Sequence, residues 1–131
     1  MRFRLRMTAV LTLLAAAFPA WAQAPEGRFG NPGRFMPQSG EGLYADLCQA
    51  CHMPGGVGAI GAGAYPALAS DPKLASGGFA LAMVIRGQKA MPPFGGFLTD
   101  EQAAAVVNYI RGHFGNHFAD EVTAGDAKAA R

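Results

Sequence analysis

The chain has 131 residues and a formal net charge of +2, from 11 Lys and Arg against 9 Asp and Glu. Three of the arginines lie within the first six residues, so the chain beyond residue 22 carries a net charge of −1. A slightly acidic chain offers no basic surface for nucleic acid or an anionic membrane. Its length is that of one small domain.

The first 22 residues have the composition of a secretory signal peptide. The early arginines precede an apolar run at residues 7–18, and a small-x-small cleavage sequence follows at residues 20–22. The apolar run is shorter than the roughly 20 residues of a membrane-spanning helix, which makes an uncleaved anchor the weaker reading. We therefore expect cleavage after about Ala22, export to the periplasm and no integral membrane segment in the mature chain.

Residues 23–38 are rich in glycine, proline and polar residues, and they predict a flexible N-terminal arm. Ser39 then fits the N-cap of a first helix, in which Leu43 and Leu47 recur at helical spacing. This helix leads directly into the sequence Cys48-Gln49-Ala50-Cys51-His52.

Cys48, Cys51 and His52 form a Cys-x-x-Cys-His motif, the attachment sequence of c-type haem. The two thiols can bond to the vinyl groups of one haem, and His52 then supplies an axial imidazole to the iron. A thioredoxin-like dithiol would need a strand before the motif. A zinc site could use His113 and His117, which are spaced H-x3-H, but it would need them much closer to Cys51 than the 61 residues that intervene. The sequence offers neither, so it predicts one covalently bound haem c.

The chain after the motif alternates between loops and short helices. Residues 53–64 are too glycine-rich for regular structure and predict a loop. Asp71 followed by Pro72 predicts the start of a helix of one or two turns. A further short helix through residues 79–85 is expected to end at Gly87.

Thr99-Asp100-Glu101-Gln102 is a capping box that opens the clearest helix in the chain, with an apolar stripe that should face the first helix. Residues 118–131 are polar and rich in alanine, and they predict a tail with weak helical tendency. No strand signal appears beyond residue 22. The predicted fold is therefore all-α, with short helices wrapped around one covalently bound haem.

The second axial ligand of the iron is expected to be Met91. It lies in a loop stiffened by Pro92 and Pro93, 39 residues beyond His52, which is enough chain to reach the opposite face of the haem. A thioether ligand favours reduced iron and leaves no open site for a substrate. The alternative ligands are less well placed. Met53 lies beside His52, Met83 in an apolar helix and Met36 in the arm. His113 and His117 lie at and beyond the end of the last helix.

These motifs together resemble the class I monohaem c-type cytochromes of bacteria. The resemblance covers residues 39–117 and rests on four motifs in order: Gly40-x3-Tyr44-x3-Cys48-x2-Cys51-His52, Tyr65-Pro66-x-Leu68, Gly87-x3-Met91-Pro92, and Tyr109. It implies the cytochrome c fold, with Gly40 and Tyr44 packed against Tyr109. It also implies that the Pro66 carbonyl accepts from His52 and that Leu68 lines the haem.

The same resemblance implies an electron carrier and not an enzyme. The sequence after Phe114 is similar to cytochrome subunits of periplasmic dehydrogenases that contain flavin, quinone or molybdenum centres. Such a dehydrogenase would be the electron donor, and a downstream cytochrome or terminal oxidase the acceptor. Residues 89–94 would rim the contact, and Arg86 would face a propionate or the partner. The alternative is a haem enzyme or gas sensor with an open distal site.

Overall fold

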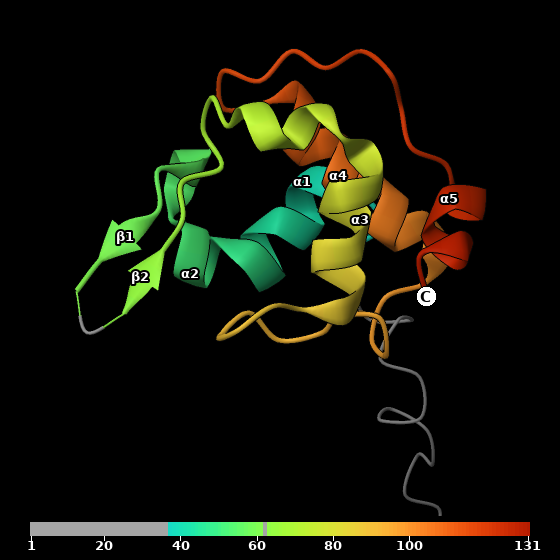
Figure 1. Cartoon of the computed structure of the whole chain (residues 1–131), viewed down its shortest axis with the longest axis horizontal. Coiled ribbons are helices and arrows are strands. Elements are labelled where there is room, and N and C mark those ends of the chain that lie inside the picture. The colour runs from blue at the N-terminus through green and yellow to red at the C-terminus, as the bar shows by residue number, and fades with distance from the viewer. Residues whose placement is uncertain (1–36, 62) are drawn as a thin grey trace, which may run out of the picture. The chain divides into compact units, whose positions relative to one another are not determined.

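The computed structural model describes residues 37–61 and 63–131, all of which belong to one compact unit (Figure 1). The expected signal peptide and nearly all of the arm lie outside the described residues. The predicted first helix is confirmed as a continuous helical run that passes through a π-helical turn. Its parts are α1 (Gly40–Leu43), η2 (Tyr44–Cys48) and α2 (Gln49–His52). The Ser39 hydroxyl accepts a hydrogen bond from the Gly42 amide at 3.2 Å and caps the run, as predicted.

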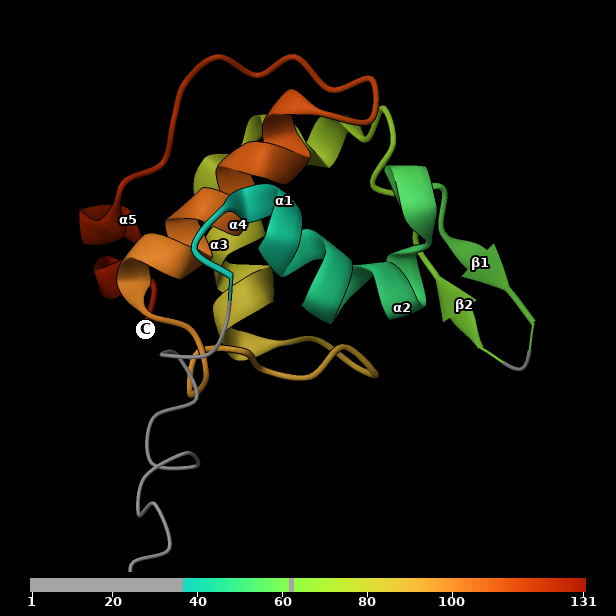
Figure 2. The ribbon, with the colours of Figure 1, turned by 180° about the vertical axis from the view of Figure 1, so that it is seen from behind.

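The glycine-rich segment after the motif differs from the prediction of a loop without strands. A short 3-10 turn, η3 (Pro54–Gly56), is followed by two strands, β1 (Ala59–Ile60) and β2 (Ala64–Tyr65), which pair antiparallel. Two-residue strands are too short to show an alternating pattern, and the flanking glycines signal only a loop. The ribbon projects from the helices beside α2 in both views (Figures 1 and 2).

The middle of the chain follows the predicted helix boundaries closely. Asp71 caps η4 (Pro72–Ala75), a single 3-10 turn, and Ser76 caps α3 (Gly77–Arg86). Gly87 ends α3 with φ of 68°, a left-handed conformation that glycine adopts without a steric cost.

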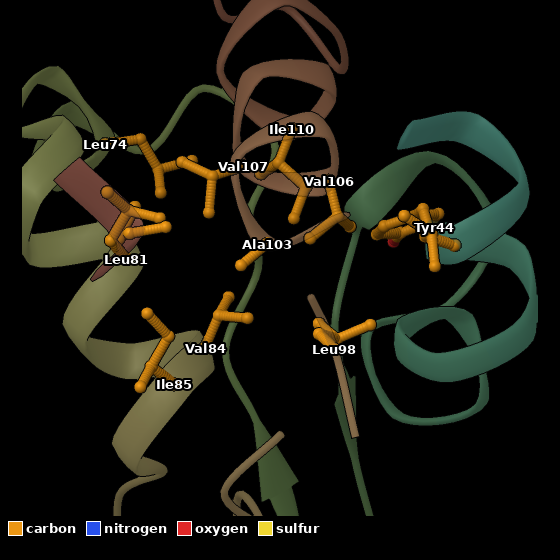
Figure 3. Close-up of a cluster of buried hydrophobic side chains, with 13 residues drawn as sticks. Tyr44, Leu74, Leu81, Val84, Ile85, Leu98, Ala103, Val106, Val107 and Ile110 are labelled. Atoms are coloured by element: carbon orange, nitrogen blue, oxygen red, sulfur yellow. The ribbon is translucent and has the colours of Figure 1, made fainter. Parts of the chain in front are cut away.

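The helix α4 (Asp100–Gly112) lies at the centre of the core. It opens with the predicted capping box between Thr99 and Gln102, and it packs against α1, α3 and the last helix. Figure 3 shows its apolar side chains between those of α3 and Tyr44 of η2. The buried residues of this core include Leu43, Tyr44, Leu81, Val84, Leu98, Ala103, Val106, Val107 and Ile110. The all-α class is confirmed, with the small ribbon as an addition.

The C-terminal segment, residues 118–131, is more ordered than its composition indicated. It ends in α5 (Ala124–Ala129), which has a capping box between Thr123 and Asp126. Ala127 of this helix is fully buried, and α5 packs against α3 and α4. Alanine can pack closely against a neighbouring helix, but this segment has no apolar stripe from which the contact could be predicted.

Candidate haem site

The Cys-x-x-Cys-His motif lies at the C-terminal end of the first helical run. Cys48 ends the π turn, and Cys51 and His52 belong to the last helical turn. All three residues are half-buried, and Cys48 packs against the edge of the core. Residues three apart on a helix lie on the same face, so the two thiols can serve one flat ligand. π turns are frequent at functional sites, where they redirect side chains.

The Cys48 thiol differs from the nucleophilic thiol of a redox dithiol. Burial, followed by the nearby Cys51, raises the pKa of the Cys48 thiol to about 11. Catalytic dithiols instead have a thiol with a lowered pKa, because the thiolate is the nucleophile. The surroundings of Cys48 therefore do not favour the thioredoxin-like alternative.

The His52 ring is oriented by the backbone of the segment that follows the ribbon. Its Nδ1 lies 2.9 Å from the carbonyl oxygen of Pro66. A carbonyl can only accept, so Nδ1 carries the proton and Nε2 is left with the lone pair that binds a metal. A hydrogen bond of this kind fixes the tautomer and the ring plane of a metal-binding histidine.

The residue after His52 has an unusual backbone conformation. Met53 has φ of 64° and ψ of 160°, a region that residues other than glycine rarely occupy. The Tyr44 hydroxyl donates a hydrogen bond to the Met53 carbonyl at 2.8 Å. Burial, then the neighbouring Cys48, raises the pKa of Tyr44, so the hydroxyl remains a donor. This contact, which the sequence did not indicate, holds the chain as it leaves the motif.

Close helix packing fixes the position of the motif relative to α4. A Cβ on Gly40 would lie 2.2 Å from the Ala105 carbonyl oxygen and 2.6 Å from the Tyr109 Cβ. The Tyr44 ring lies 5.9 Å from the Tyr109 ring and 4.7 Å from the Phe114 ring. The helices α1 and α4 therefore come into direct contact at Gly40, and aromatic rings pack together one turn further on.

Met91 lies in the loop between α3 and α4, which runs back toward the side of the molecule that carries α2 (Figures 1 and 2). Its amide donates to the Gln88 carbonyl at 2.9 Å, and its carbonyl accepts from the Gln88 amide at 3.1 Å. A Cβ on Gly87 would lie 2.5 Å from the Met91 carbonyl oxygen. The side chain is half-buried against the core, so the loop presents Met91 inward at a defined position.

The residues around the motif fit a covalently held, flat apolar group. A set of half-buried side chains from separate elements packs against the core while each keeps some exposed surface: Leu47, Cys48, Leu68, Met91 and Phe94. The set supplies sulfur atoms and apolar side chains, and the motif adds the Cys51 thiol and the His52 imidazole with its oriented Nε2. This is the donor set that a c-type haem requires.

The residues expected to rim the contact with a partner are mostly exposed, whereas Arg86 makes a contact within the chain. Among residues 89–94, Lys89, Ala90, Pro92 and Pro93 are exposed, whereas Phe94 packs against the core. The Arg86 Nε donates to the Ala130 carbonyl at 2.8 Å, a contact that the sequence analysis did not foresee.

The alternative histidine ligands follow the end of α4, and both are exposed. His113 stacks on Tyr109 with ring centres 4.1 Å apart, and its Nδ1 lies 2.8 Å from the Tyr109 carbonyl. His117 is also exposed, and Met36 lies outside the described residues. Within residues 37–61 and 63–131 no three or more His, Cys, Asp or Glu side chains gather to hold a metal ion.

The fold and the site together define a small monohaem c-type cytochrome. The motif at a helix end, the histidine held by a proline carbonyl, and the half-buried apolar shell converge on that class.

The family comparison agrees with this class. A family model described as cytochrome c oxidase, cbb3-type, subunit III matches residues 35–110, and the chain belongs to this family of c-type cytochromes. It is also similar to the gluconate 2-dehydrogenase cytochrome c subunit of Pantoea cypripedii, with 36% identity over 109 residues. The match covers 72% of this chain and 24% of that protein, so the chain spans about a quarter of its relative.

Membership of the family establishes the cofactor and the general role. The chain holds covalently bound haem c and carries electrons. In the part of the chain that the structure describes, no helix has both the length and the apolar character needed to cross a membrane.

Proposed function

We propose that this protein is a periplasmic electron carrier in which His52 and Met91 are the axial ligands of the haem iron. The observation that carries the proposal is the hydrogen bond between His52 Nδ1 and the Pro66 carbonyl, which leaves Nε2 free to bind iron. When bound, the haem supplies a reversible one-electron couple. Cys48 and Cys51 anchor it, and Leu68 covers part of its surface.

Met91 is proposed as the second ligand because its loop is both stiff and directed inward. The paired hydrogen bonds with Gln88 fix the backbone on one side of it, and two prolines restrict the backbone on the other. A thioether ligand raises the reduction potential of the iron and closes the site to exogenous ligands. The role of residues 39–117 is then to bury one redox group and leave its edge accessible.

We further propose that the electron donor is a dehydrogenase with a flavin, quinone or molybdenum centre, and that the acceptor is a downstream cytochrome or terminal oxidase. Support comes from the relative, whose name is that of a dehydrogenase cytochrome c subunit. The surface near the site suits brief contact with a protein, since Val57 is 64% and Ile60 94% exposed on the segment leading to Pro66. Transient electron-transfer contacts are small.

Replacement of Met91 tests the ligation directly. The variant Met91→Leu keeps an apolar side chain of similar volume and removes the sulfur. We expect it to lose the thioether-to-ferric charge-transfer band of the oxidised protein and to bind carbon monoxide when reduced. Met83→Leu, in α3, is the matched control and should retain the band.

A wild-type protein that lacks the band and binds carbon monoxide readily would overturn the assignment. It would favour the alternative of a haem enzyme or gas sensor with an open distal site.

Purification of the mature haem protein from its native periplasm at low salt tests the proposed partner. Stoichiometric recovery of a flavin, quinone or molybdenum dehydrogenase is expected for a dedicated subunit, whereas recovery of the cytochrome alone would indicate a diffusible carrier.

A further inference from the structure

The loop that carries Met91 is fastened to α3 just after its two prolines. The Phe94 amide donates to the Val84 carbonyl and the Gly95 amide to the Ile85 carbonyl, both at 3.0 Å. These carbonyls belong to the last turn of α3, whose acceptors have no partner within the helix. Only three residues lie between Met91 and Gly95, two of them prolines, so a movement at Gly95 is passed to Met91 through a stiff segment.

Arg131 fastens the same loop from the other side. Its guanidinium donates to the Leu98 carbonyl at 2.8 Å and to the Gly95 carbonyl, and its Nε forms an ion pair with Asp100 at 2.6 Å. The side chains of Arg131 and Asp100 are 35% and 26% exposed, so the pair is partly removed from water. The planar guanidinium allows one side chain to bind all three acceptors at once.

The C-terminal segment holds Arg131 in this position. Ala127 is fully buried against the core, and the Arg86 Nε, from α3, donates to the Ala130 carbonyl. The backbone immediately before Arg131 is therefore tied to the same helix that anchors Phe94 and Gly95. The C-terminal segment and the Met91 loop are thus both attached to α3, and the Arg131 side chain connects them to each other.

We propose that Arg131 is a positioning residue for Met91, which keeps the loop closed and so keeps the thioether on the iron. This inference rests on the proposed ligation by Met91. A neutral thioether is displaced when the loop opens, and an added ligand then binds in proportion to the open fraction of the protein. Loss of the Arg131 contacts raises that fraction.

The test compares ferric wild-type protein with Arg131→Ala and with Lys128→Ala, which removes the same charge from the exposed side of α5. Imidazole is the probe, and its binding is followed by loss of the thioether-to-ferric band. We expect Arg131→Ala to bind imidazole about three to ten times more tightly, the effect of losing a half-exposed ion pair and its hydrogen bonds. Lys128→Ala should match the wild type, and Arg131→Lys should restore part of the difference.

Amide hydrogen exchange supplies a readout that does not depend on the ligand. In Arg131→Ala the protection of the Gly95 amide should fall by the same factor as imidazole affinity rises, because one loop opening controls both. The proposal is overturned if Arg131→Ala and Lys128→Ala behave alike, or if protection falls equally throughout α4. A wild-type protein without the band would overturn the Met91 ligation alone, since the exchange at Gly95 still reports on the loop.

Discussion

At the scale of single residues, the segment leaving the haem motif depends on one tyrosine hydroxyl. Met53 occupies a backbone region that costs about 1–3 kcal/mol for a residue with a Cβ. The hydroxyl of the buried Tyr44 donates a hydrogen bond to the carbonyl of this residue. His52 therefore enters its hydrogen bond with Pro66 from a backbone that is fixed on both sides.

The variant Tyr44→Phe tests this contact. The ring and its packing on Phe114 remain, whereas the Met53 carbonyl loses its donor, so we expect the free energy of unfolding to fall by about 1 kcal/mol. Denaturant unfolding of the haem protein measures the change. Tyr65→Phe, in the exposed ribbon, is the control and should be nearly neutral. Equal stability of Tyr44→Phe and wild type would show that the hydroxyl does not hold the segment.

The haem attachment motif was the part of the site that could be predicted from the sequence. The Cys-x-x-Cys-His motif needs no tertiary information, because its spacing alone identifies haem attachment. The Tyr44 contact could not be predicted, since it depends on the turn at Met53. Nothing in the sequence marks a non-glycine residue as left-handed.

At the scale of elements, the contact between α1 and α4 depends on the missing side chain of Gly40. A Cβ there would collide with the α4 backbone at Ala105, so the two helices would have to separate. Separation would also weaken the contacts of the Tyr44 ring with those of Tyr109 and Phe114. The packing of the motif-bearing helix is therefore sensitive at this one position.

Two glycine-to-alanine substitutions should have opposite effects. Gly40→Ala is expected to destabilise the protein by about 1–3 kcal/mol because it overpacks a helix contact. Gly78→Ala, in α3, has no atom within 4 Å of its added Cβ and should stabilise the protein by about 0.5–1 kcal/mol. Thermal unfolding of both variants checks the signs. A neutral Gly40→Ala would mean that α1 and α4 approach less closely.

Local signals predicted the first helical run, η4, α3 and α4, and they failed where structure depends on distant contacts. Ser39, Asp71, Thr99 and Gly87 mark helix boundaries through hydrogen bonds within a few residues. The helix α5 is different, because its burial depends on α3 and α4. The ribbon escaped prediction because its register depends on a turn through glycines.

At the scale of the whole molecule, one buried arginine joins three distant parts of the chain. Arg111 of α4 is 1% exposed and donates to the carbonyls of Leu74, at 2.8 Å, and Ala75, at 3.1 Å. It also donates to the Asp120 carboxylate at 2.8 Å and to the Asp120 carbonyl. Through this side chain η4, α4 and the C-terminal segment behave as one body. The sequence could not predict this role, because an arginine in the last turn of a helix is expected to lie on the surface.

This junction gives the stability of the molecule a dependence on acid. The hydrogen bond from Arg111 lowers the pKa of Asp120 from its ordinary value of 3.8. A carboxyl whose pKa is lower in the folded state stabilises the fold above its unfolded pKa, and this stabilisation is lost as the pH falls through the folded value. The carboxyl is exposed, so the effect is modest.

The variant Asp120→Asn should therefore unfold at lower denaturant concentration than the wild type at pH 7. The two midpoints should converge as the pH falls well below 3.8, because the wild-type carboxyl is then protonated. Urea unfolding across this range measures the difference, with Glu121→Gln as the neighbouring control. A constant difference at all pH values would contradict the role given to the ionised carboxyl.

The position of Arg131 in the chain has a consequence for how the protein is made. Its acceptors, from Gly95 to Asp100, precede it by 31 to 36 residues. A chain that emerges from its N-terminus presents Cys48, Cys51 and His52 long before α5 exists. Haem attachment can thus proceed while the Met91 loop has only α3 to support it. Once the last helix has emerged, its contacts complete the support of the loop, so the position of Arg131 allows haem attachment to precede full closure of the loop.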